Sequence, residues 1–469
     1  MDRDGLRYPG EHDAVAGQPI PPRPRGRRPA HAAPSGAAFR VALVAAIAVL
    51  LLAPPAAVAY ATAREGRAVT LTGQGLAGAP GRDVAGRPDA AAGAGRQPGP
   101  GATRGPAPTT AEGKIQLALQ DQSAALLTGD EDAFLSVVDP SAAGLREDLA
   151  RRFGSLRQLQ VKLWQAVLSG KPRTAGGTAT ATVYVKYCFV VTTCDPMDFE
   201  TTTKWNVAGQ SVTLLEFGTA DQLGPRPWEA AELHAVVGNR VVMAASAKYA
   251  ARLPAMLAAA ERAAALTDTF ARWGEPPARY VVYLAGPDEW SSWYGIHQQP
   301  WVAGFALPLT ASATEIVLNA SRVDARQTVD VLRHEFTHVV TLAGVERAYP
   351  HTWWLVEGIA EYVRVKGGGK SFDGLGEVRT YVRSGHWNGE IAMDDPPDGS
   401  TTADVSGRYG VAYLSLQHIA DRFGEERLLS FFDYAARQGL PLSDAAPKAL
   451  GVSWDDLEAD CAKAVRGRI

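Results

Sequence analysis

The sequence HEFTH at residues 334–338 and the sequence WLVEGIAEY at residues 354–362 decide how this chain is interpreted. On an α-helix, positions i and i+4 lie about 40° apart, so His334 and His338 share one face. Two imidazoles at this spacing can hold one zinc ion, and Glu335 beside them can take a proton from a metal-bound water. Apolar residues at helical spacing predict a helix here: Val329, Leu332, Phe336 and Val340.

The second sequence supplies a third ligand of the right chemical type. Catalytic zinc normally keeps three protein ligands and one open position. Glu357 follows His338 after eighteen residues, on a second apolar stretch at 353–365. Glu361 lies one helical turn further on the same face, where a carboxylate can orient the free ring nitrogen of a ligand histidine. HEFTH alone would also fit a surface helix with two solvated histidines.

Together, HExxH, eighteen residues and WLxEGxAEY resemble the gluzincin metallopeptidases of the thermolysin and M1-aminopeptidase type, a group called peptidase MA. The resemblance covers roughly residues 270–469 and is strong only around 334–361. It implies zinc as the cofactor and a role for five residues. These are His334, His338 and Glu357 as zinc ligands, Glu335 as general base, and Glu361 as the carboxylate that orients a ligand histidine. A metal-free, degenerate relative is the alternative.

The resemblance also implies an α+β fold for residues 247–469, with a small mixed sheet and a helical bundle. The sequence predicts a helix over 247–273, for which Pro254 marks a possible start. Strands are predicted at 280–284, 302–307 and 314–319, and later helices at 409–423, 426–437 and 453–465. Peptide substrate is expected along residues 303–305, where an edge strand pairs with extended chains by backbone hydrogen bonds. An ordinary edge strand is the alternative.

In the resembling family, a tyrosine at the first helix of the C-terminal bundle donates a hydrogen bond to the oxyanion. Tyr409 is the best match, Tyr413 one turn further is the substitute, and a packed helix tyrosine is the alternative. The remaining histidines His351, His386 and His418 are expected to be surface or packing residues.

Residues 113–246 read as a separate α+β unit. Helices are predicted at 115–127, 133–138 and 149–167, followed by alternating strands at 180–187, 199–207, 212–217 and 236–244. Helices followed by a curved antiparallel sheet resemble an NTF2-like (SnoaL-like) domain, which implies a cone-shaped ligand pocket. A spacer or substrate-positioning module is the alternative.

The three cysteines bear on the redox environment of the chain. Cys188 and Cys194 flank the turn between two predicted strands, so in an exported protein they are expected to pair across the hairpin. Two reduced core thiols are the alternative. Cys461 is left over and is expected to pack inside a helix bundle.

The N-terminal quarter of the chain, residues 1–112, predicts export. Residues 1–38 form a basic leader rich in Pro and Gly, and residues 39–62 contain an uncharged run of about 20 residues, enough to span a bilayer. Basic residues precede this run, so the positive-inside rule places everything after it outside the cytoplasm. A single-pass membrane anchor is favoured over a cleaved signal peptide. Residues 63–112 are rich in Ala, Gly and Pro and predict a flexible linker.

Charge and motifs limit the classes of function and partner that the sequence predicts. With 47 basic and 50 acidic residues the net charge is −3, so nothing favours nucleic acid as a partner. The sequence predicts a membrane-anchored zinc peptidase that acts on peptides or proteins. It has no GxMEN-like segment near residues 290–320, which argues against an aminopeptidase and favours an endopeptidase. The alternative is a tethered binding or scaffold protein whose peptidase site is retired.

Overall fold

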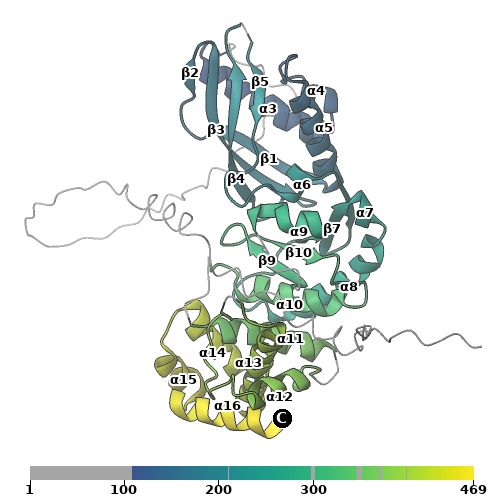
Figure 1. Ribbon diagram of the computed structural model, residues 1–469. Helices are drawn as coiled ribbons and strands as arrows, with labels where there is room; N and C mark the ends of the chain where they lie inside the picture. Colours follow the sequence, from purple (N-terminus) through teal and green to yellow (C-terminus); the bar gives the residue numbers. More distant parts are fainter. Residues whose placement is uncertain (1–107, 210, 297–301, 346–350, 369–371, 398) are drawn as a thin grey trace, which may run out of the picture.

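A computed structural model describes residues 108–209, 211–296, 302–345, 351–368, 372–397 and 399–469 (Figure 1). The predicted leader, the predicted anchor or signal segment and most of the predicted linker lie outside these residues. Among the residues described, no helix has the length and apolar character needed to cross a membrane. Figure 1 shows a first sheet at the top, a second sheet in the middle and the C-terminal helices at the bottom. The predicted α+β class is confirmed.

The first sheet is antiparallel and is preceded by helices, in the predicted order. Its strands run in the order β1-β3-β4-β5, and β2 pairs with the first residues of β3, Thr178–Thr180. Residues alternate between buried and more exposed along β4, as expected for a sheet with one face on a core. The elements are α3 (Ala111–Thr128), α4 (Glu131–Leu135), α5 (Ala143–Gln158), β1 (Val161–Leu168), β2 (Arg173–Ala175), β3 (Thr178–Phe189), β4 (Met197–Asn206), β5 (Thr213–Phe217) and α6 (Pro227–Ala230).

Asp139 joins the loop after α4 to this sheet. Its carboxylate accepts hydrogen bonds from the hydroxyls of Ser141 (2.6 Å) and Thr213 (2.5 Å) and from the Asn206 amide (3.2 Å). These donors, with Ser141 contributing most, hold the pKa of Asp139 well below its usual range.

The predicted helix over 149–167 is wrong in its second half. The helix α5 ends at Gln158, and Gln160 adopts a positive φ of 53° that turns the chain. Residues 161–168 then form β1, which pairs with β3. The apolar residues of this stretch fit both the helical period and the strand period, and pairing with β3 stabilises the strand.

The second sheet is mixed, as predicted, and has the order β6-β7-β8-β10-β9. β7 and β10 run parallel to β8, whereas β6 and β9 are antiparallel to their neighbours. β9 is therefore an edge strand, as predicted. The strands are β6 (Leu233–Val237), β7 (Val241–Ser246), β8 (Tyr280–Ala285), β9 (Gly304–Pro308) and β10 (Thr314–Asn319).

Two details of the sequence prediction need correction here. The single strand predicted at 236–244 is a hairpin, because the chain turns between β6 and β7. Both strands had been assigned to the unit 113–246, but β7 hydrogen bonds to β8 and so belongs to the second sheet. The boundary between the first and the second sheet along the chain therefore lies before β6, not after β7.

The helices of the second unit pack around and below this sheet (Figure 1). Most predicted helices are confirmed, and α8 begins at Leu253 with Pro254 in its first turn. The helices α9, α12 and α15 were not predicted. The elements are α7 (Ala247–Ala250), α8 (Leu253–Thr267), α9 (Pro287–Ser292), α10 (Thr328–Thr341), α11 (Trp353–Gly368), α12 (Leu375–Arg383), α13 (Thr402–Phe423), α14 (Glu425–Phe432), α15 (Leu442–Leu450) and α16 (Trp454–Arg468).

The cysteines follow the favoured prediction. Cys188 and Cys194 form a disulfide with their Cα atoms 6.3 Å apart. Cys461 is a free, buried thiol on α16.

Candidate metal centre

The helix α10, which carries HEFTH, is fixed at both ends. At its start the carboxylate of Asp324 accepts a hydrogen bond from the backbone N–H of Gln327 (2.9 Å), and the Gln327 side chain accepts one from the Asp324 N–H (3.1 Å). This reciprocal pair, similar to a capping box, fixes the turn that leads into α10. At its end, Arg437 donates to the carbonyls of Thr341 (2.8 Å) and Ala343 (2.9 Å).

The helix α11, which carries Glu357, approaches α13 closely at Gly358. A Cβ atom at Gly358 would lie 3.0 Å from the Leu416 side chain and 3.1 Å from the Ala412 carbonyl oxygen. Glycine therefore allows the two helices to lie close together. This contact places Glu357 on α11 near the residues of α13 that face the same site.

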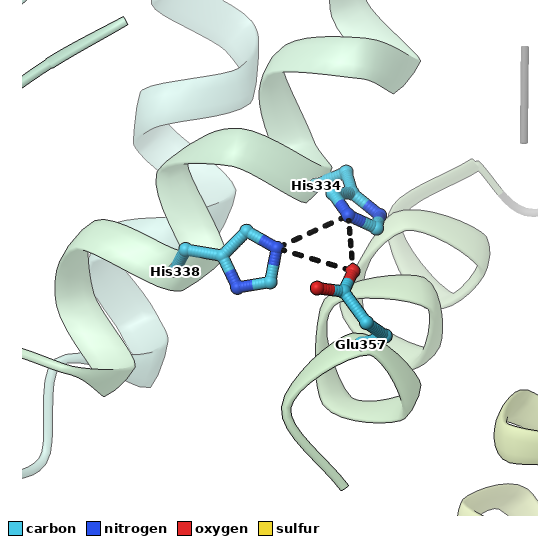
Figure 2. Close-up of side chains that lie close together, drawn as sticks. All are labelled: His334, His338 and Glu357. Atoms are coloured by element: carbon cyan, nitrogen blue, oxygen red, sulfur yellow. Dashed lines mark hydrogen bonds and ion pairs between the residues drawn. The ribbon is translucent and has the colours of Figure 1, made fainter. Parts of the chain in front are cut away.

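Three side-chain atoms from α10 and α11 form a compact triangle (Figure 2). The Nε2 atoms of His334 and His338 lie 3.1 Å apart. Oε2 of Glu357 lies 3.2 Å from Nε2 of His334 and 3.5 Å from Nε2 of His338. All three residues are buried, with exposed fractions of 3 to 6%. The structure thus brings together a group that could hold a metal ion.

The geometry and the chemistry of this triangle fit zinc. At about 2.0–2.1 Å from the metal, two ligand atoms of a tetrahedron are roughly 3.4 Å apart, close to the three separations seen here. Two imidazoles and one carboxylate form a ligand set typical of catalytic zinc, which keeps a fourth position for water or substrate.

A second carboxylate orients His334 from behind. Nδ1 of His334 lies 2.8 Å from Oε1 of Glu361, which is 1% exposed. With the Nδ1 proton directed at Glu361, the Nε2 lone pair points to the metal position. Arg364 then holds Glu361 through its Nε (3.0 Å to both oxygens) and its Nη2 (2.7 Å). The sequence prediction included Glu361 but missed Arg364.

The electrostatics of the site favour a positive charge. Burial alone lowers the pKa of His334, but hydrogen bonds to Glu357 and Glu361 outweigh it and raise this pKa to about 10. Burial likewise raises the pKa of Glu361, yet the charge of Arg364 and the contact with His334 lower it to about 2. Buried carboxylates around two imidazoles therefore stabilise a cation, which a metal ion supplies.

Glu335 lies on the same helix, and the backbone of Ala306 on β9 is near its carboxylate without forming a hydrogen bond of good geometry. Both oxygens are buried and have no hydrogen-bond partner among the described residues. Burial raises the pKa of Glu335 well above its usual range, and the charge of Glu357 adds to the shift. Nδ1 of His338 is also buried without a partner in the described part of the chain. Several buried polar atoms without protein partners are expected where water or substrate binds.

Of the two tyrosine alternatives, Tyr409 is the one at the site. Its ring centroid lies 6.1 Å from that of His334 and 5.1 Å from that of Trp353, and it is fully buried. Burial raises the pKa of Tyr409 well above its usual range, and the charge of Glu357 contributes further. Tyr413 instead stacks on Phe372 at 4.4 Å. The helix α13 begins at Thr402, so Tyr409 lies two turns inside it and not at its start.

None of the other histidines that the structure describes belongs to the group that could hold a metal. His351 and His386 are exposed and pair with Asp394 and Asp404, respectively, and His418 pairs with Asp460. The residues of β9 are buried up to Leu307, and this strand lies against α10 at the edge of the sheet.

Comparisons with known proteins agree with the chemistry of this site. Residues 307–374, which include β10, α10 and α11, match the model of a family described as BSP, a peptidase of plants and bacteria. This match supports a peptidase. No match to a curated protein sequence was found.

Two solved structures illustrate the level of overall likeness. They are mutants of a two-domain M1 zinc metallopeptidase, one bound to L-arginine (15% identity, TM-score 0.28) and one bound to L-tryptophan (16% identity, TM-score 0.27). Each alignment covers 65% of this chain, which spans 60% of the length of those proteins. TM-scores this low carry no weight for the function.

Proposed function

We propose that this protein is a zinc-dependent peptidase of the gluzincin type. The single observation that carries the proposal is the buried triangle of His334, His338 and Glu357, with the free carboxylate of Glu335 on the same helix. The match of residues 307–374 to a peptidase family agrees with it. When bound, zinc polarises the peptide carbonyl and lowers the pKa of a bound water toward about 7.

The side chains of the protein then have distinct tasks in the hydrolysis. Glu335 takes a proton from the attacking water and later delivers it to the leaving amine. The C–N bond breaks, and one water is consumed for each peptide bond cleaved. Tyr409 donates a hydrogen bond to the oxyanion, an interaction often worth about 3 kcal/mol. Glu361 keeps His334 in the tautomer that presents Nε2 to the metal.

Two further parts of the proposal come from the sequence alone. Residues 39–62 anchor the protein in the membrane, with the peptidase unit outside the cytoplasm, or are removed as a signal peptide. N-terminal sequencing of protein recovered from the producing cells separates these two outcomes. The absence of a GxMEN-like segment favours an endopeptidase, and the part of residues 113–246 that precedes β6 is proposed to be an NTF2-like positioning module.

Metal analysis combined with a cleavage assay tests the enzymatic proposal. Purified wild-type protein is expected to contain stoichiometric zinc and to cleave casein. His338→Ala should lose both properties, whereas Glu335→Gln should keep zinc and lose cleavage. His386→Ala is the matched control, because this exposed histidine pairs with Asp404 away from the triangle.

The possible failures separate the alternatives. Folded wild-type protein without zinc would contradict the metal site. A zinc-loaded wild type that cleaves no member of a broad peptide library would favour the tethered binding protein. Full cleavage by Glu335→Gln would be compatible with the zinc site but would contradict the role of Glu335 as general base.

A further inference from the structure

Residues 393–395 lie between the two helices that carry Glu357 and Tyr409. The carbonyl of Met393 accepts a hydrogen bond from the backbone N–H of Trp354, in the first turn of α11 (3.3 Å). Arg408 of α13 donates to the carbonyl of Asp394 (3.1 Å), and the Asp394 carboxylate pairs with His351 (2.8 Å). The segment is therefore held from both sides, and the position of the next residue, Asp395, is well defined.

Among the residues that the structure describes, no cationic side chain forms an ion pair with the carboxyl group of Asp395. Its Oδ1 atom is buried and has no hydrogen-bond partner among the described residues, although the side chain as a whole is only half-buried. Burial raises the pKa of Asp395 to about 6, and the charges of Glu357 and Asp394 shift it in the same direction. Asp395 is near the metal-ligand residue Glu357 because Met393, two residues before Asp395, hydrogen bonds to Trp354, one helical turn before Glu357 on α11.

Other acidic residues of this loop and of α11 and α13 differ from Asp395 in this respect. Asp394 pairs with His351, Asp404 with His386, and Glu361 with Arg364. A buried acceptor without a donor is costly in a native protein, and it commonly marks the place of a bound water or ligand. Since Asp395 is half-exposed beside the proposed reaction centre, a substrate group can reach it.

We propose that Asp395 is a specificity-determining residue that binds a cationic group of the substrate next to the scissile bond. A carboxylate without a cation forms its strongest hydrogen bonds with an ammonium or guanidinium group. A peptide offers this chemistry from two sources, its free α-amino group or the side chain of a lysine or arginine. The first makes the protein an aminopeptidase, and the second makes it an endopeptidase selective for basic residues. The inference rests on the proposed peptidase function.

Matched peptides test this with the full-length protein. One peptide is N-acetylated and neutral, a second has the same sequence with a free α-amino group, and a third is N-acetylated with lysine placed in turn beside the cleaved bond. The wild type is expected to cleave one of the two cationic forms with a kcat/KM about 10- to 100-fold above the neutral peptide. Asp395→Asn should lower kcat/KM for the cationic peptide to the value for the neutral peptide, whereas Asp394→Asn should retain the preference.

Asp394→Asn is the matched control because it removes the same charge from the same segment, but from a carboxylate that already has a partner. Equal cleavage of cationic and neutral peptides by the wild type would overturn the inference. So would an equal loss for all peptides in Asp395→Asn with zinc content unchanged, which would indicate that Asp395 holds only a water. An equal loss of the preference in both variants would also overturn the inference, because the negative charge of the whole loop, and not Asp395, would then set the preference.

A binding measurement keeps this test separate from the proposed hydrolysis. Dissociation constants for the same peptides are measured with Glu335→Gln and with Glu335→Gln/Asp395→Asn. Tighter binding of a cationic peptide that is lost in the double variant supports the role of Asp395, even if the wild type cleaves nothing and the hydrolysis proposal fails. Identical dissociation constants in the two variants contradict it.

Discussion

Replacing Arg364 by methionine removes the group that holds Glu361 behind His334. In the structure, Arg364 makes a forked contact with Glu361, and one oxygen of Glu361 also contacts Nδ1 of His334. Methionine keeps much of the side-chain volume but donates no hydrogen bond. The variant therefore leaves a carboxylate that is 1% exposed with one remaining partner, the ligand histidine.

Two effects of different size are expected from this change. Breaking a buried ion pair costs about 3–5 kcal/mol of stability, since the remaining charge stays buried. Loss of an outer partner of a metal ligand typically weakens metal affinity about 10- to 100-fold, equivalent to roughly 1.4–2.7 kcal/mol. Arg364→Lys should fall between the wild type and Arg364→Met, because lysine keeps the charge but not the fork.

Zinc affinity is measured by competition with a chromophoric chelator, and stability by urea unfolding of the metal-free protein. Arg333→Met is the control, because Arg333 forms a contact with Asp330 (3.1 Å) at the same i,i+3 spacing within one helix. Arg333 contacts none of the proposed ligands through a hydrogen bond in the described structure. Wild-type zinc affinity in Arg364→Met, or an equal loss in Arg333→Met, would refute the reasoning.

Three changes outside the site test the fold. Folding lowers the pKa of Asp139 from 3.8, so its contribution to stability should be complete above about pH 4 and should decline at lower pH. Asp139→Asn should reduce this decline. Urea midpoints of both proteins at about pH 3 and about pH 7 measure it. Replacing Cys188 and Cys194 together by serine should lower the unfolding free energy by about 2 kcal/mol for this short loop, measured by urea denaturation. Gly407→Ala places a Cβ 2.2 Å from a side chain of α12 and should cost about 1–3 kcal/mol in thermal unfolding, unlike Gly154→Ala, which meets nothing within 4 Å.

The parts of the site that follow local geometry could be predicted from the sequence. The spacing of His334 and His338 fixes their shared helix face, and the same rule places Glu361 one turn after Glu357. The choice between Tyr409 and Tyr413 could not be made in this way. It depends on where α13 starts and on the packing of Tyr413 against Phe372, a residue distant in sequence.

The features that the sequence analysis missed depend on contacts between distant segments. Arg364 has a function only because Glu361 faces His334 across two helices. Asp395 lies beside α11 and α13 because its segment hydrogen bonds to both helices, whereas the sequence Asp-Asp-Pro-Pro by itself indicates only an irregular loop. The strand β1 was likewise predicted as helix because its partner β3 is not visible in a local window.

The two sheets also meet through a buried carboxylate that no local pattern reveals. Glu315 of β10 is fully buried and accepts hydrogen bonds from Tyr294 (2.5 Å), Tyr283 (3.4 Å) and Tyr187 (3.4 Å). Tyr187 belongs to β3 of the first sheet, and the buried guanidinium of Arg226 stacks over Tyr294. Because β10 also pairs with the edge strand β9, this cluster couples the first unit to the strand on which substrate is expected. A free spacer would need no such contact, so the cluster favours a positioning role for the first unit.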